Sequence, residues 1–229
     1  MKRSHFLAIS AVFVLIAAAV AAWLYPHLPA RVPSHWDARG HVDGYTTRLH
    51  GAMLPALMLA GTALVGVVLP LISPRRFAIT PFAKVYFGLL LVVEGFMLVT
   101  GLAVLLAAAG HDVPVTAITL LGTGVLFLVL GNYMGKMRKN FFIGIRTPWT
   151  LADDDVWERT HRLGGRLFML VGVLFLVAGM VGGMAWVPVA AIVIAAVVPI
   201  VYSWVAYVRL QRQRHPGRRE AAPSSEKKP

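Results

Sequence analysis

Long apolar runs alternate with short polar stretches along the whole chain. A helix needs about 20 apolar residues to cross the hydrocarbon core of a bilayer, and six runs have about this length: residues 6–24, 51–72, 85–109, 116–134, 167–185 and 187–208. Backbone groups in lipid must be satisfied within the segment, which a helix achieves. The pattern therefore predicts an all-α integral membrane protein with six transmembrane helices.

Composition supports this fold class. The 229 residues are 58% hydrophobic and 14% charged, whereas soluble domains carry about 25% charged residues. The net charge of +12 would suggest nucleic acid as the partner of a soluble protein. Here it fits basic loops beside a lipid bilayer, so we expect no direct nucleic-acid binding. The chain has no cysteine, which excludes disulfides and thiolate chemistry.

Basic residues predict the orientation, because cytoplasmic loops are rich in Lys and Arg. Most of them lie in the N-terminus, the second loop, the fourth loop and the tail, while the first loop holds Arg31, Arg39 and Arg48. We therefore expect both termini inside, in a bacterial cytoplasmic membrane. Ala19-Val20-Ala21 resembles a signal-peptidase site, but the first apolar run is long for a signal peptide.

Three parts are predicted along the chain. Residues 1–72 form a two-helix unit with an ordered outer loop at 25–50, residues 73–208 form a four-helix unit with an inner loop at 135–165, and residues 209–229 form a disordered basic tail. The tail is rich in Arg, Pro and Ser, so it cannot bury enough apolar area to fold.

The outer loop carries dense turn signals, among which Asp43-Gly44 predicts a tight turn. Its His35, Asp37, His41 and Asp43 are side chains that bind zinc elsewhere. Their spacing matches no known metal motif and Arg39 lies among them. We therefore expect turn caps and headgroup contacts rather than a metal site or a membrane metalloenzyme, and no cofactor.

The inner loop predicts a short cytoplasmic interfacial helix over residues 151–163. Thr150 and Asp153 resemble a capping box, Asp153, Asp154 and Asp155 suit a first helical turn, and Gly164-Gly165 ends the segment. The sequence also suggests close helix packing at Gly179 and Gly183, a small-xxx-small pair.

Glu94 is an ionisable residue near the middle of the third apolar run. Charge at that depth is costly, so such residues usually face the bundle interior and carry a function or a partner. This leaves open a second class of function, a small secondary transporter that uses Glu94 as an ion or proton site.

Two polar-aromatic strings resemble the SdpI-like bacterial membrane proteins. Pro33-Ser34-His35-Trp36 through Gly40 to Asp43-Gly44 is similar to the family's N-terminal domain of unknown function. The stretch 140–151, followed by Val156-Trp157 and Thr160-His161-Arg162, resembles the family's second part. The resemblance implies a non-enzymatic protein that gives immunity to a secreted peptide toxin and signals to a cytoplasmic transcriptional regulator.

The two strings supply the candidate binding residues. For contact with a peptide outside, the outer loop offers Pro33, His35, Trp36, Gly40, Asp43 and Gly44. For contact with a partner inside, the inner loop offers Asn140, Phe141, Gly144, Arg146, Thr147, Pro148, Trp149, Trp157, His161 and Arg162.

Overall fold

The computed structural model describes residues 1–37, 41–72, 82–140, 143–182 and 186–214. Six long helices are apolar enough to cross a membrane, as predicted: α1 (Arg3–Leu24), α2 (Arg48–Leu71), α3 (Ala83–Ala108), α4 (Val115–Met134), α6 (Asp154–Val181) and α7 (Trp186–Arg214). The remaining elements are the 3-10 turn η1 (Tyr25–His27), the strands β1 (Arg31–Trp36) and β2 (Val42–Thr47), and the short helix α5 (Pro148–Ala152).

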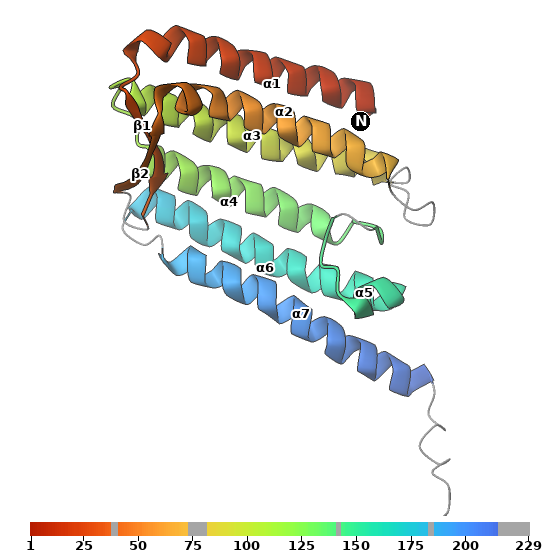
Figure 1. The fold of residues 1–229 in the computed structure, drawn as a ribbon. Helices are drawn as coiled ribbons and strands as arrows, with labels where there is room; N and C mark the ends of the chain where they lie inside the picture. The colour runs from red at the N-terminus through yellow and green to blue at the C-terminus, as the bar shows by residue number, and fades with distance from the viewer. Residues whose placement is uncertain (38–40, 73–81, 141–142, 183–185, 215–229) are drawn as a thin grey trace, which may run out of the picture.

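The six helices run alternately up and down (Figure 1). The strands lie at one end of the bundle, which we call the hairpin end. The start of α1, the end of α7 and the helix α5 lie at the other, the inner-loop end. This alternation is what the Lys/Arg pattern requires, and the side of the membrane that each end faces stays a prediction.

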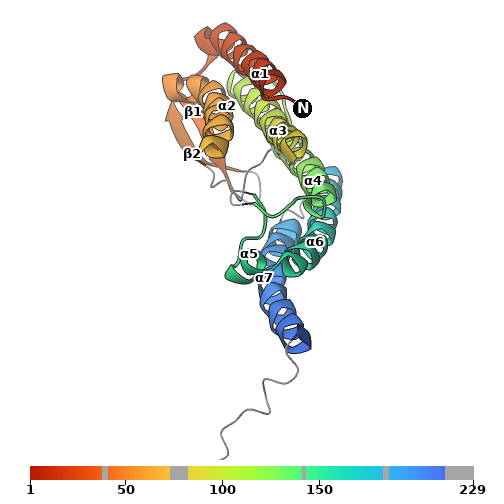
Figure 2. The same cartoon turned by 90° about the vertical axis from the view of Figure 1, so that its right-hand side faces the viewer.

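The helices pack as a cluster that continues into a row. Helices α1, α2 and α3 contact one another, α3 also contacts α4, and α6 packs between α4 and α7. Figure 2 shows the resulting curve from α1 to α7. Helix α3 packs against α1 and α2 and also against α4. The three-part division of the chain stays a prediction.

The outer loop folds as a β-hairpin, which adds a strand pair to the predicted all-helical fold. β1 pairs antiparallel with β2, from Arg31 opposite Thr47 to Trp36 opposite Val42. The prediction of a tight turn at Asp43-Gly44 was wrong, because both residues lie inside β2. A Cβ on Gly44 would lie 2.8 Å from the His35 Cβ, so this glycine permits close strand approach at an irregular register.

The inner helix also differs from its prediction. Thr147 and Thr150 form a capping box for α5, and Asp153 caps α6 on its own. Helix α6 then continues through Gly164 and Gly165 to Val181, so there is no separate helix that ends at this glycine pair. Gly165 instead faces α4, where an added Cβ would lie 2.6 Å from the Gly131 carbonyl oxygen.

A second glycine pair, Gly124 and Gly172, repeats this contact one heptad further along both helices. A Cβ on Gly172 would lie 2.8 Å from the Gly124 carbonyl oxygen. Gly179 continues the series against Leu121, at 2.9 Å from its Cγ, whereas Gly183 lies outside the described residues. Small residues at this spacing let two antiparallel backbones touch, which is how helices associate in lipid.

Candidate functional sites at the two ends of the bundle

The hairpin is fixed to the start of α2. The Thr47 side chain caps α2 by accepting from the His50 N–H, and the Arg48 N–H donates to the Ala30 carbonyl at 3.1 Å. A Cβ on Gly51 would lie 2.9 Å from Val32 atoms, so β1 lies directly on the helix. The hairpin is therefore held against the bundle at a set position.

Two clefts open beneath the hairpin and share Ser34 and Trp36 in their walls. The first, of about 260 Å³, lies against α2 and α3, and its floor includes Met58, Phe96, Met97 and Val104. The second, of about 380 Å³, lies against α3, α4 and α7, and is lined by His35, Asp37, Val104, Val115, Thr116, Thr119, Leu120 and Val189. An apolar floor beneath a polar rim suits an amphipathic ligand.

The histidines and aspartates of the hairpin form cross-strand pairs. The His35 imidazole contacts the Asp43 carboxylate, and His41 lies 3.4 Å from Asp37. Asp37 also accepts the His41 backbone N–H at 2.9 Å. Within the described part of the chain, no three such side chains gather as a metal site would require.

The outer-loop candidates differ in exposure. His35 of β1 and Asp43 of β2 are exposed, while Pro33, Trp36 and Gly44 are half-buried. Gly40 lies outside the described residues. Among these candidates, Trp36 is the residue that lines both clefts.

At the inner-loop end, Asn140 and Trp157 fix the start of the loop. The buried Asn140 side chain donates to the Arg138 and Ile143 carbonyls and accepts the Ile143 N–H at 2.7 Å. The Trp157 indole N–H donates to the Met137 carbonyl at 2.8 Å. The Asn140 bonds close the loop on itself, and the Trp157 bond ties it to α6.

His161 holds the next residues of the loop. Its Nε2 accepts the Ile145 N–H at 3.0 Å, so the ring proton sits on Nδ1 and donates to the Trp157 carbonyl at 2.8 Å. The ring also stacks on Trp157, with centroids 3.9 Å apart. Gly144, at φ +112°, makes room, because a Cβ there would lie 2.3 Å from Nε2.

Thr147 connects the loop to α7, and Thr150 holds the loop to itself. The Thr147 hydroxyl lies 2.9 Å from the Ser203 hydroxyl of α7, and the buried Thr150 hydroxyl donates to the Ile145 carbonyl at 2.8 Å. The loop therefore contacts both α6 and α7, which places it where a movement of either helix would reach it.

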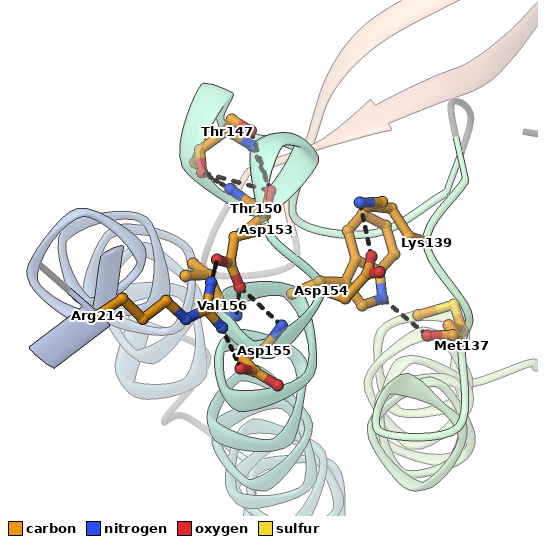
Figure 3. A network of polar contacts seen from close by, with 10 residues as sticks. Met137, Lys139, Thr147, Thr150, Asp153, Asp154, Asp155, Val156 and Arg214 are labelled. Carbon is orange, nitrogen blue, oxygen red and sulfur yellow. Dashed lines mark hydrogen bonds and ion pairs between the residues drawn. The ribbon is translucent and has the colours of Figure 1, made fainter. Parts of the chain in front are cut away.

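The three predicted helix-start acids pair with bases (Figure 3). Arg214 binds Asp153 and Asp155 at 2.5 Å each, and Lys139 binds Asp154 at 2.6 Å. Burial raises the pKa of the Asp153 carboxyl. The Val156 N–H and the Arg214 guanidinium together lower it by more than burial raises it, so this pKa lies below its usual range. Asp153 and Asp155 therefore hold the end of α7 against the start of α6.

Asp153→Asn tests the ion pair, because asparagine still caps a helix but has no charge. We expect the variant to be less stable than wild type at pH 7, where the ion pair stabilises the fold. This contribution to stability is fully present above the ordinary aspartate pKa of about 3.9. It is lost as the pH falls through the lowered pKa that Asp153 has in the folded protein. Thermal unfolding in detergent should show the two proteins converging below pH 4, and a constant difference would contradict the assignment.

The inner-loop candidates fall into two groups. Asn140, Thr147, Trp157 and His161 are buried, so they support the loop from within. Gly144, Arg146, Pro148 and Arg162 are exposed and Trp149 is half-buried, and these can reach a partner directly. Phe141 lies outside the described residues.

Sequence reasoning missed Ser203 and Arg214. Arg214 was assigned to a disordered tail, yet α7 extends to this residue. The three adjacent acids were the available signal, since partly buried carboxylates require a cation.

Glu94 is fully buried, as its depth predicts, and accepts the Ser10 hydroxyl at 2.7 Å. Its second oxygen has no hydrogen-bond partner among the residues that the structure describes. The contact joins α3 to α1 within the N-terminal cluster.

A bundle of six apolar helices with a structured loop at each end defines a multi-pass membrane protein. Residues 136–203 match the model of the SdpI/YfhL protein family, and residues 12–59 match a domain of unknown function, DUF1648. The chain is therefore similar to the SdpI-like membrane proteins in both of these parts, as its two polar-aromatic strings predict. It is 26% identical to the immunity protein SdpI of Bacillus subtilis (strain 168) over 208 residues, which is 90% of this chain and 98% of the relative. No solved structure matches the chain.

Proposed function

We propose that this protein is a membrane immunity protein in a bacterial cytoplasmic membrane, which binds a membrane-active peptide at its hairpin end. The observation that carries the proposal is the pair of clefts joined at Ser34 and Trp36. Similarity to an immunity protein along nearly the whole chain supports the same role. A peptide that inserts into membranes carries apolar and polar faces, which match the floor and the rim of the clefts.

The inner loop is proposed to report occupancy to a cytoplasmic regulator. It bonds to α6 through His161 and to α7 through Ser203. Val189 of α7 lines the second cleft, so one helix connects the two ends. The exposed Arg146 and Pro148 would then present a changed surface to the partner.

Trp36→Ala tests the binding role, with Tyr45→Ala as its control, because Tyr45 is an exposed aromatic residue of β2 that lines neither cleft. Truncating an aromatic residue that anchors a ligand costs about 2 kcal/mol or more. We therefore expect Trp36→Ala to reduce protection by roughly thirtyfold, and Tyr45→Ala to keep it.

The measurement is survival of toxin-sensitive cells that express each variant, challenged with the toxin that the Bacillus subtilis immunity protein counters. Membrane abundance is measured in parallel by immunoblot. Full protection by Trp36→Ala at wild-type abundance would contradict the binding role of the clefts, and equal loss in both variants would show that the hairpin acts only as a support.

A further inference from the structure

A stripe of arginines occupies the outward face of α6 at the inner-loop end. Arg159, Arg162 and Arg166 are exposed. With about 100° between successive residues, they fall within roughly 60° of arc. They are therefore presented together on one side of the helix.

The end of α4 adds a fourth cation beside this stripe. A Cβ on Gly135 would lie 3.5 Å from the Arg162 Cγ, so Arg162 lies next to the chain that leaves α4. The following residue, Lys136, is exposed and has its ammonium group 4.9 Å from the centre of the Tyr133 ring. The segment that follows α4 therefore brings Lys136 to the same end of the bundle as the stripe, one residue after the glycine that lies beside Arg162.

Among the residues that the structure describes, nearby acids balance little of this positive charge. Asp153 and Asp155 bind Arg214, and Asp154 binds Lys139. Glu158 faces the stripe at 3.7 Å from Arg162, but both side chains are more than half exposed, and such a pair contributes little. The surface can therefore accept an external anion.

The same face of α6 continues directly into an apolar surface. Below Arg166 it carries Met169, Leu170, Val173 and Val177, which are 42%, 57%, 48% and 40% exposed. A ligand that covers the whole face needs an anionic head and an apolar body. A phospholipid has this shape, whereas an acidic protein would meet the charges alone.

We propose that Lys136, Arg162 and Arg166 bind the phosphate headgroup of an anionic phospholipid, such as phosphatidylglycerol, whose acyl chains lie along α6. Arginine suits phosphate because its planar guanidinium donates two parallel hydrogen bonds. Basic residues beside a transmembrane helix attract anionic lipid by roughly fivefold per residue. The site therefore selects anionic phospholipids, and it lies where the end of α4 meets α6.

The test uses the full chain purified in mild detergent and exposed to equal amounts of phosphatidylglycerol and phosphatidylcholine, with native mass spectrometry of the retained lipid. We expect the wild type to retain phosphatidylglycerol with about a hundredfold preference, because three cations each contribute about fivefold. Arg162→Gln/Arg166→Gln should reduce this preference to the roughly fivefold that Lys136 supplies. The control, Arg209→Gln/Arg212→Gln, removes the same charge from the inner-loop end of α7 and should keep the preference.

Equal loss in both double variants would overturn the site, because net charge alone would then explain binding. A wild type without preference would also overturn it and leave an acidic protein as the ligand. Displacement of the lipid by millimolar glycerol 3-phosphate would show a site for free phosphate instead. If the first variant does not fold, Arg159→Gln/Arg166→Gln tests the stripe while keeping the Glu158–Arg162 pair.

Discussion

Gly172→Ala is expected to lower the thermal midpoint of the protein by about 5 °C. The added methyl would lie 2.8 Å from the Gly124 carbonyl oxygen and 2.9 Å from Leu128 atoms, so α4 and α6 must separate. Overpacking of this kind costs about 1–3 kcal/mol, and each kcal/mol shifts the midpoint of a protein this size by about 2–4 °C. Thermal unfolding in detergent, followed by size-exclusion chromatography, measures the change.

Gly88→Ala is the matched control, because a Cβ on this α3 residue would meet no other group within 4 Å. Its midpoint should equal or exceed that of wild type, since alanine favours the helix by about 1 kcal/mol. Equal midpoints for Gly172→Ala and Gly88→Ala would show that the α4–α6 contact is looser than described.

Gly144→Ala is expected to release the inner loop. Its φ of +112° strains any side chain, and its Cβ would meet the His161 Nε2. Backbone strain costs about 1–3 kcal/mol, and a lost buried hydrogen bond adds about 1–3 kcal/mol. The loop should then become sensitive to limited proteolysis while the transmembrane helices stay folded.

Gly135→Ala controls this experiment, because its Cβ would meet Arg162 only at 3.5 Å and its φ of −69° suits any residue. It should resist protease as wild type does. Resistance of Gly144→Ala to the same protease would contradict the role of His161 as the support of the loop.

The apolar runs predicted the six helices because a bilayer restricts a spanning segment to one kind of structure. Loops lack this restriction, and there the prediction failed in detail. Asp43-Gly44 has turn chemistry, yet Gly44 serves a close strand contact with His35. Gly164-Gly165 resembles a helix end, yet Gly165 meets Gly131 across two helices. Local pattern does not show which partner a glycine faces.

The candidate sites were predicted as strings of residues, and the structure separates their roles. Trp157 and His161 belong to a polar-aromatic string, but their buried bonds to Met137 and Ile145 make them supports. The clefts at Trp36 depend on residues from α2, α3, α4 and α7. Such a surface forms only when distant segments pack, so no local pattern could predict it.

Site-specific photo-crosslinking in living cells tests the proposed peptide binding most directly. A photoreactive amino acid at Ser34, which is exposed and lines both clefts, should form an adduct with the toxin during challenge. The same residue at Lys136, at the opposite end of the bundle, should form none. An adduct at Lys136 but not at Ser34, or protected cells with no adduct at Ser34, would contradict binding at the hairpin end.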